Sequence, residues 1–341
     1  MNRTIAVTGG TGYIAGFVIA DFLNHGYIVR ASVRSLARMD GLKKALSAYV
    51  GQEALSRLSA FEADLTASKG WAESFSGTDG ITHVASPLGH GTESAEELRR
   101  IAEGGTLNVL QGALDAGVKR VVMTSSQAAS TPPVSVGKVV LDETFWSDEA
   151  NSELDPYRLS KIASEKAAWA FSAKHGLDLS TILPGAVFGP VMSADNISSN
   201  VILLRLINGG IPRSLNIPLE VSDVRDLAAL HRLAFENSNA IGERFLAASQ
   251  TIRMPEVARI YHEQYPQSKT PAKVFPNWTV RLMSKFVPSL RSMVPMLGRE
   301  YSHTTEKAER ILGWTQHTPQ DTVLDAAVSF DQLGMIKSRR H

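Results

Sequence analysis

The sequence predicts a doubly wound, parallel α/β sheet followed by a smaller, mainly helical C-terminal lobe. Short apolar runs typical of buried strands alternate with longer runs of helical periodicity through the first half of the chain. A glycine-rich turn joins the first strand to the first helix, as dinucleotide-binding sheets require. The 341 residues exceed one typical domain, so we expect two lobes around a substantial core.

The elements follow one another in a regular order. We expect strands at residues 4–8, 27–33, 58–63, 80–84, 119–123 and 178–183, and helices at residues 17–23, 93–115 and 156–174. Because the carboxyl ends of parallel strands meet at one edge of a sheet, the residues that follow them should share one crevice. Those residues are Asp64, Ala85, Ser86, Pro87, Thr124, Ser125, Ser126, Pro184 and Gly185.

The glycine-rich turn spans residues 9–16, with the sequence GGTGYIAG. Gly9 permits a tight turn, and Gly12 lets the backbone approach a pyrophosphate. Ala15 stands where a third glycine is common, and it is still small enough for close contact between helix and strand. The free amides and the positive end of the next helix favour a phosphate. An ordinary turn is the alternative, but the position directly after the first strand favours a dinucleotide site.

The end of the second strand predicts which dinucleotide binds. An NAD site usually presents an acidic side chain there, whereas here Val33 is followed by Arg34, with Arg38 nearby. Charge-assisted hydrogen bonds to a 2′-phosphate contribute ~1.5–3 kcal/mol each. We therefore expect NADPH or NADP as the cofactor, with Arg34 at its 2′-phosphate. A solvated basic helix start is the alternative, and it suits Lys43 and Lys44 better.

Tyr157 and Lys161 lie four residues apart at the start of an expected helix, so their side chains share one face. An ammonium about 4 Å from a phenolate attracts it by ~4 kcal/mol at an effective dielectric constant of ~20. Such a tyrosine can give or take a proton at cellular pH. The chain has a second pair, Tyr265 and Lys269, but Pro266 keeps Tyr265 out of a helix. We interpret the second pair as coincidence.

With these motifs in order, the chain resembles the extended short-chain dehydrogenase/reductase family, and within it the dihydroflavonol-reductase-like branch that includes NADPH-dependent aldehyde (carbonyl) reductases. The resemblance covers nearly the whole chain. It rests on TGGTGYIA at 8–15, ADL at 63–65, HVASP at 83–87, VVMTSS at 121–126, YRLSK at 157–161 followed by ASE at 163–165, PGAVFGP at 184–190, VRDLAALH at 224–231 and KAERILGW at 307–314.

The resemblance implies that Ser126, Tyr157 and Lys161 are catalytic. Ser126 would hydrogen-bond the substrate carbonyl oxygen, and Tyr157 would protonate that oxygen as hydride reaches the carbon. Lys161 would bind the nicotinamide ribose and favour the phenolate. Ser125 is the alternative for the serine role. The residues implied at the cofactor are Gly9, Thr11, Gly12, Tyr13, Ile14, Arg34, Asp64, Leu65, Val84, Ala85, Ser86, Tyr157, Lys161, Pro184 and Val187.

The implied activity is the NADPH-dependent reduction of a small-molecule aldehyde or ketone to an alcohol. Residues 127–133 lack the Val-Tyr-Gly that often follows the serine in sugar-nucleotide epimerases, which favours reduction. Three alternatives stay open: an NAD(P)-dependent sugar-nucleotide epimerase or dehydratase, a hydroxysteroid dehydrogenase, and a non-catalytic NADP-binding regulator. The regulator would not need the serine, tyrosine and lysine together.

The composition and net charge limit the kinds of partner that we expect the protein to bind. A net charge of +1 gives no broad field for nucleic acid, and a chain without cysteine has no disulfide or metal thiolate. The scattered histidines predict no metal site. The sequence shows neither a charged and apolar leader nor an apolar run of ~20 residues. We expect a cytoplasmic monomer or homodimer that binds neither nucleic acid nor membranes.

The two lobes are expected to interleave. The Rossmann-type NADP-binding domain would comprise residues 1–184 and 221–247, and the substrate-binding lobe residues 185–220 and 248–341. Within that lobe, residues 278–297 are rich in methionine and apolar residues. Core packing is the favoured interpretation, because Pro288 and Pro295 interrupt any long amphipathic helix; a pocket wall and a membrane-facing surface are the alternatives. Residues 128–155 and 191–217 are better candidates for substrate selection.

Overall fold

The computed structural model describes residues 3–86 and 94–337. Pro87 and the expected helix start at residue 93 lie outside the described residues. A seven-stranded sheet, parallel throughout, forms the centre of the molecule in the order β11-β7-β5-β4-β1-β2-β3. Its strands are β1 Thr4–Thr8, β2 Ile28–Val33, β3 Leu58–Glu62, β4 Gly80–His83, β5 Arg120–Thr124, β7 Asp178–Leu183 and β11 Arg244–Leu246. The predicted fold class is confirmed.

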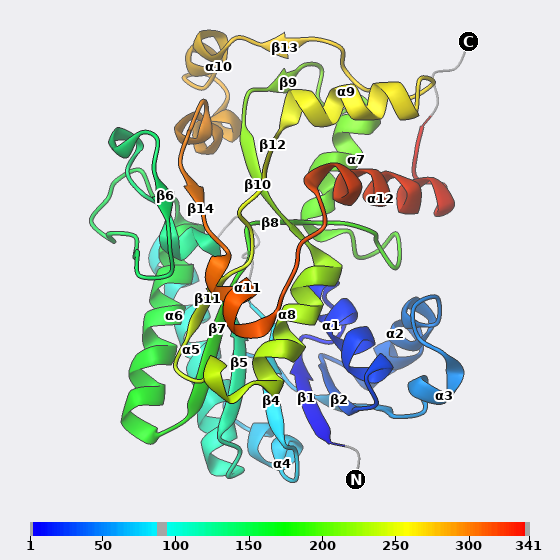
Figure 1. Cartoon of the computed structure of the whole chain (residues 1–341), viewed down its shortest axis with the longest axis vertical. Helices are drawn as coiled ribbons and strands as arrows, with labels where there is room; N and C mark the ends of the chain where they lie inside the picture. The colour runs from blue at the N-terminus through cyan, green and yellow to red at the C-terminus, as the bar shows by residue number, and fades with distance from the viewer. Residues whose placement is uncertain (1–2, 87–93, 338–341) are drawn as a thin grey trace.

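Both faces of this sheet are covered by helices (Figure 1). Helices α1 (Tyr13–Asn24) and α8 (Val224–Glu236) pack together on one face, and α5 (Ala95–Asp115) and α6 (Pro156–His175) pack together on the other. Neighbouring residues of β5 point to opposite faces, so Val122 joins the core of the first face and Val121 that of the second. Burial on both sides explains why β1 and β5 have uninterrupted apolar centres.

Helix α6 carries the Tyr157 motif, and its start is fixed by local chemistry. Asp155 is the N-cap, and its side chain accepts a hydrogen bond of 2.8 Å from the amide of Arg158. Pro156 occupies the first turn, where its missing N–H costs nothing. The helix ends at Gly176, whose φ of +69° suits a left-handed C-cap. Tyr157 is therefore held in the first turn of a long, firmly capped helix.

The remaining elements build the rest of the C-terminal lobe and the connections. The smaller sheets are β12-β10-β8, β13-β9 and β14-β6. In Figure 1, α7, α9 and α12 lie beyond one end of the central sheet. The bounds are α2 Met39–Leu46, α3 Gln52–Leu55, α4 Trp71–Phe75, β6 Val140–Leu141, β8 Ala186–Phe188, α7 Val201–Ile207, β9 Ser214–Leu215, β10 Pro218–Asp223, β12 Thr251–Arg253, α9 Met254–Gln264, β13 Val274–Phe275, α10 Asn277–Met283, β14 Ser302–His303, α11 Glu306–Leu312 and α12 Pro319–Gln332.

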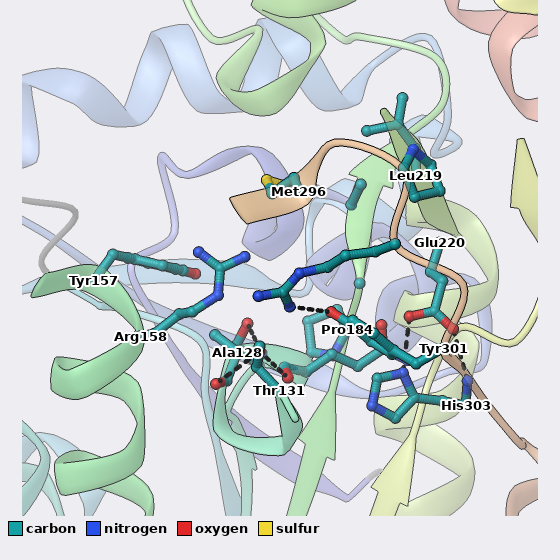
Figure 2. A pocket seen from close by; sticks show the side chains of 16 residues that line it. Ala128, Thr131, Tyr157, Arg158, Pro184, Leu219, Glu220, Met296, Tyr301 and His303 are labelled. Carbon is teal, nitrogen blue, oxygen red and sulfur yellow. Dashed lines mark hydrogen bonds and ion pairs between the residues drawn. The ribbon is translucent and has the colours of Figure 1, made fainter. Parts of the chain in front are cut away.

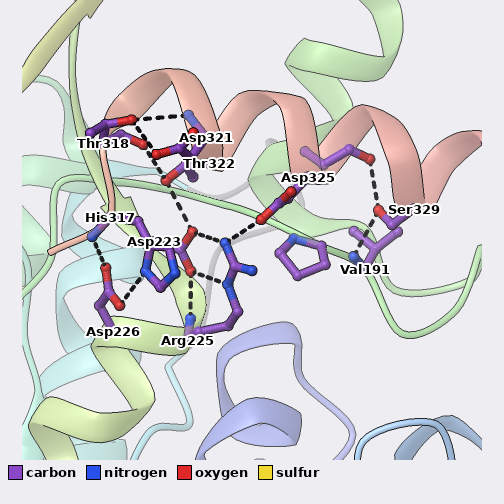
Figure 3. Close-up of polar contacts among 12 residues, drawn as sticks. Val191, Asp223, Arg225, Asp226, His317, Thr318, Asp321, Thr322, Asp325 and Ser329 are labelled. Atoms are coloured by element: carbon purple, nitrogen blue, oxygen red, sulfur yellow. Dashed lines mark hydrogen bonds and ion pairs between the residues drawn. The ribbon is translucent and has the colours of Figure 1, made fainter.

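A polar network joins α8 to the C-terminal helix α12 (Figure 3). Arg225 pairs with Asp223 and with Asp325, each at 2.7 Å. Beside them, Asp226 accepts from His317 Nδ1 at 2.6 Å. Asp223, Asp226 and His317 are close enough to hold a metal ion, but Arg225 already neutralises Asp223. The cluster serves as an ion-pair network that anchors α12.

The segment at residues 278–297 divides into parts with different surroundings. Val280 and Leu297 are buried, whereas Trp278 is 68% and Phe286 80% exposed. Core packing, the favoured interpretation, is therefore wrong for Trp278 and Phe286. The segment forms α10 and a 3₁₀ helix at Pro288–Met296, which begins at Pro288 and includes Pro295, so it is not one long helix. No helix within residues 3–86 and 94–337 is long and apolar enough to span a bilayer.

The second Tyr-x-x-x-Lys pair lies outside any helix, as expected. Helix α9 ends at Gln264, so Tyr265 and Lys269 do not share a helix face. This leaves Tyr157 and Lys161 as the pair with helical geometry.

Candidate active site

A cavity of about 470 Å³ lies at the carboxyl ends of the central strands. We call it the glycine-turn cavity. It brings together nearly all of the predicted site residues, from seven separate segments of the chain. The predicted residues that line it are Gly9, Thr11, Gly12, Ile14, Arg34, Asp64, Leu65, Val84, Ala85, Ser86, Ser126, Tyr157, Lys161, Pro184 and Val187.

Tyr13 is the predicted cofactor residue that does not line this cavity. Its phenol is buried and donates a 3.1 Å hydrogen bond to the carbonyl of Pro190. Burial raises the pKa of Tyr13 well above its usual value. Its side chain thus braces the first turn of α1, and its contact with a cofactor stays a prediction.

The glycine turn has the geometry of an anion cradle. Gly9 has a φ of +73°, and a Cβ there would come within 3.0 Å of Ala85. A Cβ on Gly12 would lie 3.0 Å from the Gly9 carbonyl oxygen. Ser32 fixes the turn by accepting from the Gly9 amide at 2.8 Å. Helix α1 has no side-chain cap, so its first-turn amides are free to bind an anion. The cradle fits a pyrophosphate.

The part of the glycine-turn cavity beside Arg34 and Arg38 is cationic. Arg34 and Arg38 both line it, and no acidic side chain follows directly on β2. Asp64 accepts hydrogen bonds from the amide and hydroxyl of Thr66, each at 2.8 Å. Those bonds, and then the charge of Arg34, hold the pKa of Asp64 below its usual value. Two guanidinium groups fit a 2′-phosphate, so this part is suited to NADP rather than NAD.

Lys161 and Tyr157 line another part of the glycine-turn cavity. Lys161 is 5% exposed, and its Nζ donates to Ser86 Oγ at 3.0 Å and lies 5.9 Å from the centre of the Tyr157 ring. Tyr157 is 36% exposed. Ser126 Oγ accepts from the Ala128 amide at 3.1 Å, and its hydroxyl hydrogen has no acceptor among the described residues, which leaves it available to a ligand. A cation, a phenol and a hydroxyl donor therefore border one space.

The neighbouring Ser125 is committed elsewhere. Its hydroxyl donates at 2.7 Å to the buried carboxylate of Glu165, which also pairs with Arg244 at 2.9 Å. The Arg244 guanidinium stacks 3.6 Å above the ring of Trp146. This geometry favours Ser126 over Ser125 as the serine that contacts a substrate.

A smaller cavity of about 220 Å³ adjoins the glycine-turn cavity, and we call it the side pocket (Figure 2). The two share Ser126, Tyr157 and residues 184–186. The walls of the side pocket come from the loop after β5, the start of α6, residues 184–186, strand β10 and residues 296–303. The lining residues are Ser126, Gln127, Ala128, Thr131, Tyr157, Arg158, Pro184, Gly185, Ala186, Pro218, Leu219, Glu220, Met296, Arg299, Tyr301 and His303.

The sequence predicted only some of the residues that line the side pocket. Met296 brings the methionine-rich segment into the side pocket, whereas residues 191–217 supply none of its described lining residues. That second segment instead reaches the glycine-turn cavity through Ser198 and Ser199. Ser198 has a φ of +44°, and Asn196 donates to the Thr11 carbonyl at 2.7 Å. No local pattern in the sequence marks these contacts.

The chain belongs to the extended short-chain dehydrogenase/reductase family. A family model described as "NAD dependent epimerase/dehydratase family" matches residues 5–248. The predicted family and its dihydroflavonol-reductase-like branch are confirmed.

Among individual relatives, cinnamoyl-CoA reductase CAD2 of Medicago truncatula is 35% identical over 294 residues, which cover 80% of this chain and 84% of that protein. Dihydroflavonol 4-reductase of Zea mays is 33% identical over 278 residues, covering 79% and 76%. Gre2 of Candida albicans, solved in complex with NADPH, superposes with a TM-score of 0.79 at 27% identity, covering 97% of this chain and 99% of that one.

Proposed function

We propose that this protein reduces an aldehyde or ketone to an alcohol with NADPH, with Tyr157 as the proton donor. The observation that carries the proposal is that Ser126 and Tyr157 line both the glycine-turn cavity and the side pocket. A carbonyl group at the junction of the two cavities would meet both hydroxyls, with the cofactor on one side and the rest of the substrate on the other.

The general class of enzyme follows from the relatives of this chain. Relatives of this chain are named as reductases, and the Gre2 structure contains NADPH. The chain is accordingly an NADP-dependent oxidoreductase that acts on carbonyl or CH–OH groups, as predicted.

Each of three residues of this chain would have a separate role in the reaction. NADPH, when bound, supplies the hydride. The free hydroxyl hydrogen of Ser126 would bond the carbonyl oxygen and stabilise the charge that develops there. Tyr157 would pass its phenolic proton to that oxygen. Lys161 pairs with no carboxylate among the described residues, so its buried charge is available to stabilise the phenolate that Tyr157 leaves.

The same geometry supports a proposal for the parts of the cofactor site. The uncapped start of α1 would hold the pyrophosphate, and Arg34 with Arg38 would hold the 2′-phosphate. Pro184 and Val187 would border the nicotinamide at the end near Tyr157.

Replacing the phenol tests the mechanism. The Tyr157→Phe variant keeps the ring but has no proton to give, so we expect kcat for carbonyl reduction to fall by ~100-fold or more. NADPH affinity, measured by titration calorimetry, should change less than ~2-fold. Tyr265→Phe, in the second Tyr-x-x-x-Lys pair, is the matched control and should keep full turnover. Full turnover by Tyr157→Phe would refute the proton-donor role.

The alternatives give different results in one assay that follows NADPH absorbance with aldehydes, ketones and nucleotide sugars. Net consumption with free aldehydes or ketones supports the proposal, and a steroid ketone reduced in preference to them would point to a hydroxysteroid dehydrogenase. Conversion of a nucleotide sugar without net consumption would instead indicate an epimerase or dehydratase. Cofactor binding without any turnover would indicate a regulator.

A further inference from the structure

The side pocket contains four side chains that can carry charge, and Figure 2 shows their surroundings. They are Arg158, Glu220, Arg299 and His303. Which of these charges is already compensated within the protein decides what kind of ligand the pocket favours.

Glu220 and His303 pair with each other. The Glu220 carboxylate accepts from the His303 amide at 2.7 Å, and it contacts His303 Nδ1 at 2.8 Å. On the other side of the ring, Nε2 lies 2.9 Å from the Ser130 carbonyl oxygen and 3.2 Å from the Ser130 hydroxyl. The Glu220 carboxylate therefore has its partner in His303, and no Arg299 nitrogen lies within the 4.0 Å of an ion pair with it.

Arg158 is also compensated. Its guanidinium pairs with Asp155, the residue that caps α6. Its Nε is nevertheless buried without a hydrogen-bond partner in the described part of the chain. Arg158 thus brings no uncompensated charge to the pocket.

Arg299 is not compensated. It is 9% exposed, its Nε donates to the Pro295 carbonyl at 2.6 Å, and its Nη1 contacts the hydroxyl of Tyr301 at 3.2 Å. The guanidinium carbon lies 5.3 Å from the centre of the Tyr301 ring. Within residues 3–86 and 94–337, no carboxylate lies within the 4.0 Å of an ion pair. A buried charge with only neutral partners is unfavourable, and an anionic ligand would relieve that cost.

We propose that the substrate of this enzyme carries a carboxylate, which binds Arg299. The proposal rests on the proposed function, because it places the substrate carbonyl at Ser126 and Tyr157. Within the described residues, Arg299 is the cation of the pocket that has no ion-pair partner, and the pocket has a volume of only about 220 Å³. A compact monoanion matches both properties better than a phosphate dianion does.

The redox step stays balanced with such a substrate. The carbonyl carbon forms a C–H bond with hydride taken from NADPH, which becomes NADP⁺. As the π bond breaks, the oxygen forms an O–H bond with the proton of Tyr157, which is replaced from water. The carboxylate is unchanged, so the product is a hydroxy acid.

Matched acids and esters test the proposal. The wild type should reduce 4-formylbenzoate and 4-oxobutanoate with a kcat/KM at least ~10-fold above that for their methyl esters, a factor that corresponds to ~1.4 kcal/mol. Arg299→Gln should lose that advantage through KM for the acids, with the esters changed less than ~2-fold. Arg299→Lys should recover part of it. Arg259→Gln, at an exposed ion pair with Glu263 on α9, is the matched control and should behave as wild type.

Binding of 4-(hydroxymethyl)benzoate to the NADP⁺-loaded protein, measured by calorimetry, gives a readout that does not need turnover. If Arg299→Gln binds this acid at least ~10-fold more weakly than the wild type does, the carboxylate site is supported. This holds even if no carbonyl compound tested is a substrate; in that case only the proposed function fails. Equal reduction of acids and esters by the wild type would overturn the carboxylate site and leave the proposed function standing. A preference for glyceraldehyde 3-phosphate over both acids would also overturn it.

Discussion

At the scale of single residues, two adjacent serines have different surroundings because the strand places them differently. Ser125 follows β5 directly and donates inward to Glu165, whereas Ser126 begins the next turn and borders both cavities. A shift of one residue along an extended chain reverses the direction of a side chain. The sequence could place the pair Ser125-Ser126 at the sheet edge, but the choice between them depends on a partner 40 residues away in the chain.

Arg34 should determine the cofactor preference. In Arg34→Gln the charge-assisted hydrogen bonds to the 2′-phosphate are lost, so we expect NADPH to bind ~10-fold to 100-fold more weakly. NADH, which has no 2′-phosphate, should change less than ~3-fold. Titration calorimetry with both cofactors measures the difference. Lys43→Gln is the control at an exposed neighbouring charge, and equal losses for NADPH and NADH in Arg34→Gln would exclude the assigned role.

The residues that sequence reasoning found differ in kind from those it missed. Gly9, Gly12, Tyr157 and Lys161 lie in short motifs whose spacing reflects a local geometry, a turn or a helix face. Arg299 has no such motif around it. It reaches the side pocket only because β14 pairs with β6 and carries the chain past β10, and this long-range packing leaves no local pattern.

At the scale of elements, one buried ion pair joins three parts of the sheet layer. Glu165 of α6 accepts from Ser125 after β5, from Thr181 of β7 and from Arg244 of β11. Both partners of the ion pair are buried, with side-chain exposures of 0% for Glu165 and 8% for Arg244. The pair fixes α6, and hence Tyr157, relative to the strand that ends at Ser126.

Breaking this ion pair should be costly. Arg244→Met leaves the Glu165 carboxylate buried without its cation, and we expect the free energy of unfolding to fall by ~3–5 kcal/mol. The double variant Glu165→Gln with Arg244→Met removes both charges and should recover most of that loss. Urea unfolding followed by circular dichroism measures both. A double variant as unstable as the single one would show that the lost packing of Arg244 on Trp146, rather than the uncompensated charge, causes the effect.

At the scale of the whole molecule, the fold buries two histidines without charge. His83 bonds Thr8 at 2.8 Å, and burial, with a smaller contribution from Lys161, lowers the pKa of His83 to about 3. His231 bonds Thr124 at 2.7 Å, and burial lowers the pKa of His231 to about 4. Since an unfolded histidine has a pKa of ~6.5, the unfolded chain takes up these protons first. The stabilisation is complete above pH ~6.5 and is lost as the pH falls towards 4.

Stability should therefore decrease between pH 7.5 and pH 5.0. Below pH ~6.5, each buried histidine lowers the free energy of unfolding by ~1.4 kcal/mol per pH unit, which amounts to ~2 kcal/mol at pH 5.0. Urea unfolding at the two pH values should show a decrease that is ~2 kcal/mol smaller in His231→Gln, and likewise in His83→Gln. His262→Gln, on the exposed side of α9, is the control. An unchanged decrease in both buried-site variants would contradict the assignment.

The molecule confirms the fold class that alternating strands and helices predicted, because a parallel sheet buried on both faces favours apolar residues along its central strands. The division into two lobes stays a prediction. One hydrophobic cluster runs from Ile5 of β1 to Phe330 of α12, so packing alone does not separate the lobes. Whether they move relative to each other depends on long-range contacts that no sequence pattern encodes.

The two cavities are completed at different times during synthesis of the chain. Every described residue that lines the glycine-turn cavity lies between Gly9 and Ser199, whereas the side pocket also needs Arg299, Tyr301 and His303. A ribosome that has just added Ser199 must add roughly one hundred more residues before the pocket has its last wall. The nascent chain thus possesses all the described side chains of the glycine-turn cavity well before those of the side pocket. Truncation of the last fifty residues would remove the second set and leave the first complete in sequence.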